Sequence, residues 1–152
     1  MGSLTWLVVL LAAALIPARS LAEVPAPAGV YLYIIWPNDG QVIKGAFSCR
    51  FGLRNMGVAP AGVRRPNTGH HHLLIDVETP PLDKPIPNDL NHIHLGGGQT
   101  EKRITLPPGE HTLQLIFADA QHMPHDPPVV SERIKVTVRS GARSGHRRSR
   151  RS

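Results

Sequence analysis

The sequence predicts an all-β fold, a small antiparallel immunoglobulin-like β-sandwich. Short segments rich in β-branched and aromatic residues recur between residues 30 and 138, and several alternate apolar with polar positions. Clusters of Pro, Gly, Asn and Asp separate these segments and mark turns. After the N-terminal apolar run, no segment combines sustained helical periodicity with capping residues. A chain of short strands joined by turns is typical of a sandwich.

The N-terminus has the pattern of a secretory signal peptide. Residues 6–16 (WLVVLLAAALI) form an apolar run that is too short to span a bilayer comfortably, and Ser20 and Ala22 fit a small-x-small cleavage site. We therefore expect residues 1–22 to be removed, which makes the mature protein periplasmic or secreted. An uncleaved anchor is the alternative. Residues 23–29 (EVPAPAG) then form a Pro/Ala spacer.

The strands are placed by their apolar residues. Residues 30–36 (VYLYIIW) are β-branched and aromatic, which indicates a strand buried on both faces. In residues 42–53 and 111–117 apolar residues alternate with others, which indicates one buried face. The predicted strands are 30–36, 42–53, 70–77, 101–106, 111–117 and 131–138. The turn sequence PPGE at 107–110 predicts a hairpin between the fourth and the fifth.

Two loops join the predicted strands in the middle of the chain. Residues 55–69 are rich in Gly, Pro and Asn and predict an irregular loop. Residues 78–90 contain four prolines, which exclude a helix. We expect this second loop to be a connector packed on the sheet, and a partner-docking loop is the alternative.

The formal net charge is +6, but the excess lies in the C-terminal segment. Residues 139–152 hold six arginines and no acidic residue, whereas residues 23–138 hold ten basic and eleven acidic residues. We expect 139–152 to be a disordered Arg-rich tail, with attraction to an anionic surface as the alternative. A nearly neutral body predicts no basic groove, so we expect no specific nucleic-acid binding.

The single cysteine, Cys49, excludes an intrachain disulfide. It lies in an alternating series with Phe47 and Phe51, which predicts a buried, unreactive thiol. We therefore expect residues 30–138 to form one domain that depends on its hydrophobic core. Such a length buries about two-thirds of the surface of the unfolded chain.

Histidines dominate the middle of the chain, where eight of the nine fall between residues 70 and 125. His70/His72 and His92/His94 each form a His-x-His pair, which a strand presents on one face at a spacing of about 6.5–7 Å. Two such pairs on neighbouring segments would suit a copper or zinc ion. We expect copper before zinc, because a Met ligand together with His favours copper and copper suits an exported protein. The predicted metal ligands are His70, His72, His92, His94 and His125, with His122 and Met123 as possible additions and Asp76 and Asp126 as hydrogen-bonding partners of the ligands.

Other readings of the histidines remain open. A hydrogen-bonded histidine network that orders loops would also explain the clusters, and the protein would then be an interaction module without metal. His71 and His111 follow inward-facing series, so we expect both to be core-edge histidines bonded to backbone. A metal-dependent enzyme is less favoured, because the chain has no His-Glu-x-x-His or nucleophile-elbow motif. An oxidase of the histidine-brace type would need a His at the mature N-terminus, whereas the expected mature terminus is Glu23. We therefore favour a carrier or sensor of a metal ion.

A set of short motifs extends over the predicted domain. These motifs are IWP (35–37), DG (39–40), RFGL (50–53), GVAPAG (57–62), NTGHHHLLID (67–76), NHIH (91–94), GQTE (98–101), LPPG (106–109), HTLQL (111–115) and PHDPP (124–128). In combination they resemble a family of bacterial exported domains known as domain of unknown function 4399. The resemblance covers about residues 30–138 and leaves out the Arg-rich tail. It implies an exported domain and assigns no activity.

Overall fold

The computed structural model describes residues 25–140, which form ten strands and no helix. The predicted signal peptide and all but the first two residues of the predicted tail lie outside the described residues. Within 25–140 no helix is long and apolar enough to cross a membrane. The strands are β1 (Tyr31–Trp36), β2 (Gln41–Lys44), β3 (Phe47–Arg54), β4 (Gly57–Val58), β5 (Thr68–Ile75), β6 (His92–His94), β7 (Glu101–Ile104), β8 (Gly109–Ala118), β9 (Pro124–Val130) and β10 (Ile134–Arg139).

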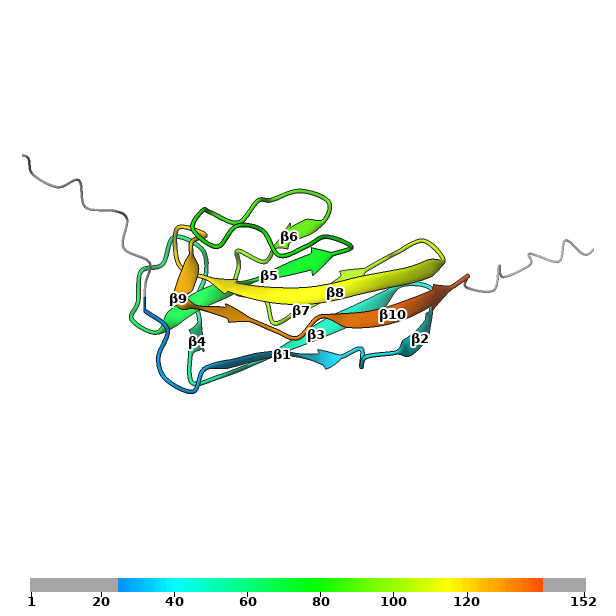
Figure 1. Ribbon diagram of the computed structural model, residues 1–152, viewed down its shortest axis with the longest axis horizontal. Coiled ribbons are helices and arrows are strands. Elements are labelled where there is room, and N and C mark those ends of the chain that lie inside the picture. The colour runs from blue at the N-terminus through cyan, green and yellow to red at the C-terminus, as the bar shows by residue number, and fades with distance from the viewer. Residues whose placement is uncertain (1–24, 141–152) are drawn as a thin grey trace, which may run out of the picture.

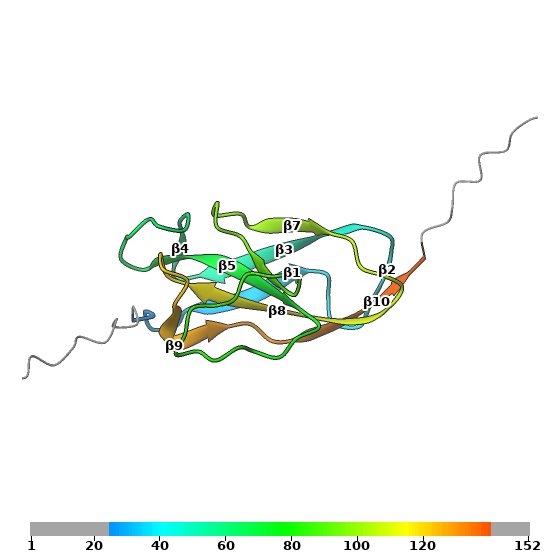
Figure 2. The ribbon, with the colours of Figure 1, turned by 90° about the horizontal axis from the view of Figure 1, so that it is seen from above.

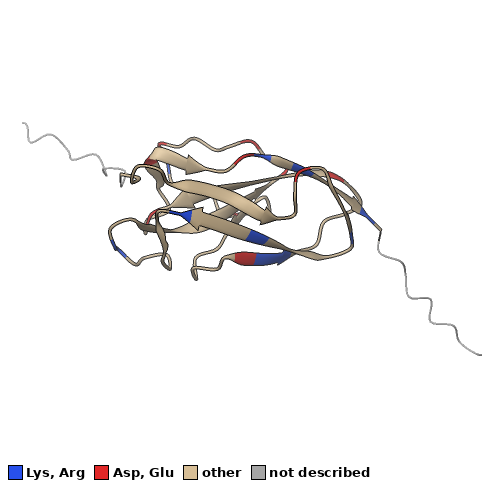
Figure 3. Cartoon of the chain, turned by 90° about the horizontal axis from the view of Figure 1, so that it is seen from below, with Lys and Arg blue, Asp and Glu red and all other residues tan. Residues whose placement is uncertain are grey.

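The strands form two sheets that pack face to face, so the predicted small β-sandwich is confirmed (Figure 1). One sheet has the order β1-β3-β7, and the other has the order β2-β10-β8-β5-β4, with β6 on β5 and β9 on β8. The pairs are antiparallel except for β2–β10 and β4–β5. The first and last described residues lie at opposite ends of the long axis (Figures 1 and 2). Acidic and basic residues are intermixed along the described part of the chain (Figure 3), and β7 itself has the sequence EKRI.

The core lies between the two sheets and is built from alternate residues of β3, β8 and β10. Phe47 and Phe51 of β3 are each 4% exposed, and Leu113 and Phe117 of β8 are fully buried. Burying each such side chain stabilises the fold by about 1.5–3 kcal/mol. Cys49 lies among them, and desolvation by burial raises the pKa of its thiol to about 12. The predicted inward face of this segment is therefore confirmed.

Two features of the predicted strand pattern are wrong. The segment 42–53 is two strands, because the chain turns at Gly45 with φ 69° and sends β2 alongside β10 in the other sheet. The predicted 101–117 hairpin does not form, since β7 pairs with β3 while β8 pairs with β10 and β5. The PPGE segment therefore connects the two sheets. Alternation shows which face of a strand is buried, but it does not show which strand is its neighbour.

Both faces of β5 are buried. β5 lies between β8 on one side and β4 and β6 on the other. Leu73 and Ile75 join the main core, whereas Leu74 packs with Ile86 and Ile116 in a second apolar cluster. Ile86 belongs to the Pro-rich loop between β5 and β6, which passes over the outer face of the sheet (Figure 1). The loop therefore packs on the sheet and shelters the polar face of β5.

Candidate metal centre

Four imidazoles meet on the sheltered face of β5. His70 and His72 alternate along β5 and so share a face. His94 ends the short strand β6 and is the register partner of His72. His122 comes from the turn that joins β8 to β9. Segments that are far apart in sequence thus bring four histidines, the tetrad of His70, His72, His94 and His122, into one cluster.

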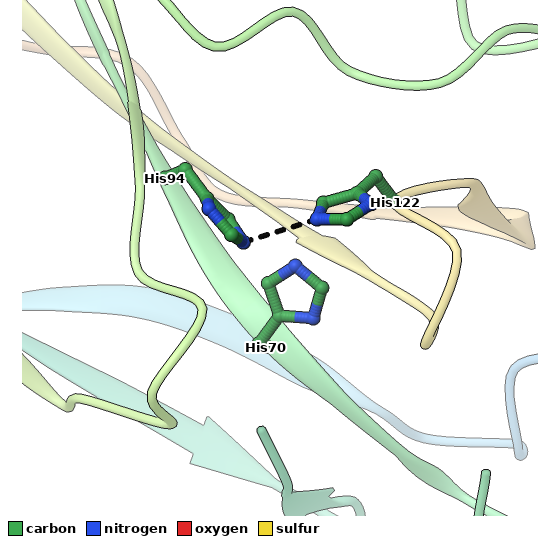
Figure 4. Close-up of side chains that lie close together, drawn as sticks. All are labelled: His70, His94 and His122. Carbon is green, nitrogen blue, oxygen red and sulfur yellow. Dashed lines mark hydrogen bonds between the residues drawn. The ribbon is translucent and has the colours of Figure 1, made fainter. Parts of the chain in front are cut away.

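All four rings of the tetrad contact one another. The six centroid separations range from 4.7 to 5.8 Å. Nε2 of His70 lies 3.1 Å from Nε2 of His72, and Nε2 of His94 lies 3.1 Å from Nε2 of His122. One ring nitrogen each of His70, His94 and His122 lies within 4.8 Å of the others. Figure 4 shows these three rings turned toward a common point, with the contact between His94 and His122 dashed.

These separations match the edges of a small coordination polyhedron. A tetrahedral ion with nitrogen–metal bonds of 2.0–2.1 Å holds its nitrogens about 3.3–3.4 Å apart. The two Nε2–Nε2 separations of 3.1 Å are close to this value. A square-planar ion would need two nitrogen pairs about 4 Å apart across its diagonals and four about 2.8 Å apart along its edges. Two of the six nitrogen pairs in the tetrad therefore have a spacing that lies between the tetrahedral and the square-planar edge, and the three ring nitrogens that all lie within 4.8 Å of one another belong to His70, His94 and His122.

The environment favours the neutral form of three rings of the tetrad, those of His70, His72 and His94. Burial, followed by the positive charges that neighbouring histidines would carry, lowers the pKa of His70 to about 4 and of His72 to about 2. Burial and then His122 also lower the pKa of His94. Neutral imidazoles have a lone pair available for a metal ion. Near pH 7, coordination at these three rings therefore does not require a proton to leave first.

Buried ring nitrogens without a hydrogen-bond partner occur inside and outside the tetrad. Within residues 25–140, Nδ1 of His70 and of His72 has no such partner, and ring nitrogens of His71 are in the same state. A buried polar atom without a partner costs about 1–3 kcal/mol. A network that merely ordered loops would be expected to bond each ring to a carbonyl or carboxylate. The polar atoms that do converge are Nε2 atoms facing one another.

Two other histidines show how this fold binds a structural imidazole. Nδ1 of His111 lies 2.6 Å from Oδ2 of Asp76, and its Nε2 lies 2.8 Å from the carbonyl of Pro107. Nδ1 of His92 lies 2.9 and 3.0 Å from the two carboxylate oxygens of Asp89. His92 was predicted as a ligand, but its ring is held by Asp89 and is not part of the tetrad.

The sequence predicted that Asp76 would orient a metal ligand, but in the structure its carboxylate contacts His111 and Thr112, which lie outside the tetrad. Its Oδ2 binds His111, and its Oδ1 accepts a hydrogen bond of 2.8 Å from the backbone N–H of Thr112. Desolvation lowers the pKa of His111, but the hydrogen bonds to Asp76 and Pro107 and the charge of Asp76 outweigh it, so that the pKa is raised. Asp76 and His111 thus tie β5 to β8 at the end of β5.

His71 and His125 lie against the main core. The ring of His71 contacts Phe51 and Phe117 at centroid distances of 5.3 and 5.1 Å, and burial lowers its pKa to about 4. His125 is 1% exposed and stacks on Phe117 at 5.9 Å. His71 is thus deeper than the core-edge position that the sequence predicted. His125, a predicted ligand, lies outside the tetrad.

The remaining predicted residues lie in or beside the β8–β9 turn. Asp126, predicted to support a ligand, is exposed, and its carbonyl accepts a hydrogen bond from the N–H of Ala26. The carbonyl of Met123 accepts a hydrogen bond from the backbone N–H of Asp119, and the N–H of Met123 donates one to Oδ1 of Asp119. The carboxylate of Asp119 accepts from the N–H groups of Gln121 and Met123, which closes the turn around His122. The backbone of His122 has φ 67°, in the left-handed region that residues other than glycine rarely adopt.

Two residues that the sequence did not single out shape the site. Asp119 is 4% exposed and fixes the turn that carries His122. Gly96 lies under the ring of His94, where an added Cβ would be 2.2 Å from Cε1 of that ring. The only signal for Gly96 was its place in a Gly-Gly-Gly run, which sequence reasoning takes as a flexible loop.

The fold and the tetrad define a small β-sandwich with a histidine cluster able to hold a metal ion. The chain belongs to the family described as a domain of unknown function, DUF4399, whose model matches residues 49–139 and so includes the whole tetrad. No curated protein sequence matches the chain. A solved structure of the Clostridium thermocellum CbhA fibronectin(III)-like modules aligns with 12% identity and a TM-score of 0.39. That alignment covers 72% of this chain and 98% of the module chain.

Proposed function

We propose that this protein binds one transition-metal ion through Nε2 of His70, His72, His94 and His122. The observation that carries the proposal is the convergence of these imidazoles, with Nε2–Nε2 separations of 3.1 Å in two pairs. The same chain bonds His92 and His111 to carboxylates, so it has the usual means of satisfying a structural histidine and does not use them in the tetrad.

Zinc and copper are the two ions that imidazole ligands at these separations suit. The sequence put copper before zinc, because Met123 lies beside the histidines and copper suits an exported protein. Zn²⁺ has no geometric preference of its own and is usually four-coordinate in proteins. Cu²⁺ prefers a tetragonal arrangement, and the two separations of 3.1 Å lie between the tetrahedral and the square-planar edge. We therefore propose copper or zinc as the bound ion.

A carrier or sensor role suits the site better than catalysis. Coordination by all four imidazoles would fill a tetrahedral ion, whereas catalytic zinc sites keep a fourth position open for water or substrate. The predicted signal peptide adds a periplasmic or secreted location to the proposal. The metal ion is the partner that the site itself indicates.

The test is metal binding by the full chain without an affinity tag, since a tag would add metal ligands. Zinc and copper titrations followed by calorimetry should give one tight equivalent, with zinc retained against a chelator that removes weakly bound ions. The His94→Ala/His122→Ala double variant should lose this equivalent and keep its fold by circular dichroism. His92→Ala is the matched control, because His92 lies on the same strand outside the tetrad. Weak binding of the same strength in all three proteins would overturn the proposal.

A further inference from the structure

The tetrad has a buried half and a half-exposed half. His70 and His72 are completely buried. His94 and His122 are partly exposed. An ion held by all four rings would therefore be shielded on one side by β5 and would approach solvent only between His94 and His122.

The two halves also differ in how the backbone holds them. His70 and His72 lie on β5, which is hydrogen-bonded to β8 along one edge and to β4 and β6 along the other. Both rings are also fully buried, so moving either one away from the ion would require the packing around β5 to open, and openings of the buried core cost more than those of loops and turns.

The half-exposed ligands lie on smaller elements. His94 is the last residue of a strand of three residues, and the Gly96–Gly97–Gly98 run follows it closely. His122 lies in the turn closed by Asp119. Its carbonyl also accepts a hydrogen bond of 2.9 Å from the N–H of Ile86 in the covering loop. Rotation of either ring outward leaves the sheet intact.

We propose that the ion enters and leaves by stepwise ligand exchange at His122 and His94, while His70 and His72 hold it. The exchanging partner is a chelator with carboxylate or imidazole donors. This inference rests on the metal-binding function proposed above and adds the route by which the ion is transferred. In each step one imidazole–metal bond breaks and one bond from the ion to the incoming donor forms. The ion keeps its charge, no electron is transferred, and the imidazole leaves as the neutral ring.

Such a route has a kinetic signature. If an incoming chelator attacks the ion at the half-exposed side, the rate of metal release increases in proportion to the chelator concentration. If the ion escapes only when β5 opens by itself, the release rate is independent of the chelator. A carrier that passes its ion to another molecule needs the first behaviour.

The experiment uses the full chain loaded with Co²⁺, whose visible absorption reports tetrahedral coordination, and nitrilotriacetate as the chelator. We expect the release rate to double when the nitrilotriacetate concentration doubles. His122→Ala, which removes a half-exposed ligand, should raise the second-order rate constant, because one imidazole–metal bond fewer has to break. His92→Ala should leave it unchanged. Hydrogen exchange of the β5 amides, measured on the same samples, gives the opening rate of the sheet.

The outcomes separate the two proposals. Release at a rate that does not change with nitrilotriacetate concentration and equals the opening rate of β5 would overturn the exchange route, while stoichiometric Co²⁺ would still support the metal site. An unchanged rate constant in His122→Ala would also overturn the route. A chain that takes up no Co²⁺ or Zn²⁺ would remove the proposed function and the exchange route with it.

Discussion

Replacing Gly96 by alanine tests the tetrad without changing any of its ligands. The added Cβ would lie 2.2 Å from Cε1 and 2.4 Å from Nε2 of His94. Carbon atoms in contact normally lie about 3.5–4.0 Å apart, so the ring has to move by roughly 1.5 Å. A bound metal tolerates ligand distances only within about 0.2 Å of the ideal value. His94 would therefore cease to be a ligand.

The expected loss follows from this displacement. Zinc affinity should fall by about 10- to 100-fold, the range seen when an orienting contact of a metal ligand is lost. The metal-free fold should survive, because Gly96 does not have a positive φ and the partly exposed His94 ring can turn toward solvent. A Gly-to-Ala change at such a position lowers the entropy of the unfolded chain, so the free energy of unfolding should change by no more than about 1 kcal/mol.

The assay is competition for Zn²⁺ against a chromophoric chelator, with thermal unfolding of the metal-free proteins alongside. Gly97→Ala is the matched control, since its Cβ would meet only the flexible end of Gln99, at 2.9 Å. Zinc affinity of Gly97→Ala should stay within about twofold of the original protein. Equal affinities for the original protein and Gly96→Ala would refute the assignment of His94 as a ligand in this position.

Three further predictions concern stability, reactivity and the turn. Because the pKa of His111 is raised, its contact with Asp76 stabilises the fold fully below pH 6.5, the ordinary pKa, and less as the pH rises through the raised pKa of the folded protein. The difference in unfolding free energy between the original protein and His111→Gln, measured by denaturant titration, should shrink over that pH range. A difference that does not change with pH would contradict the reasoning. Cys49, with a pKa of about 12, should not react with iodoacetamide at pH 8 until denaturant unfolds the chain, and rapid labelling of the folded protein would show that the thiol is accessible. Asp119→Ala removes the acceptor of two backbone N–H groups in the turn that carries His122 and should weaken zinc binding about tenfold. Asp119→Asn keeps an acceptor oxygen and should retain most of the affinity in the same competition assay. Identical affinities for the two variants would exclude a role of Asp119 in positioning His122.

The local pattern of the sequence was enough to predict the class of the fold and the composition of its core. The alternation of Phe47, Cys49 and Phe51 depends only on the two-residue period of a strand, and all three side chains are buried between the sheets. The pairing of β7 with β3 could not be predicted in this way, because the residues around the PPGE turn fit a hairpin equally well. Which edge a strand joins depends on long-range packing.

The candidate site also contains residues that local spacing predicts and residues that only long-range packing brings into place. The His-x-His spacing of His70 and His72 places both on one face of a strand, whatever surrounds it. The same rule predicted His92 together with His94, but the local contact with Asp89 holds the ring of His92 away from the tetrad. His122 supplies the fourth imidazole, and no spacing rule connects it with residues on β5 and β6.

By itself, the sequence determined a histidine-rich β-sandwich, because alternation, turn residues and His-x-His spacing act over a few neighbouring residues. The tertiary structure decided which histidines meet. It pairs β6 with β5, folds the β8–β9 turn back over both, and covers the face with the Pro-rich loop. Coordination of one ion by four rings depends on distances of a few ångströms between segments as far apart in the sequence as residues 70 and 122. Only the packing of the whole chain sets those distances.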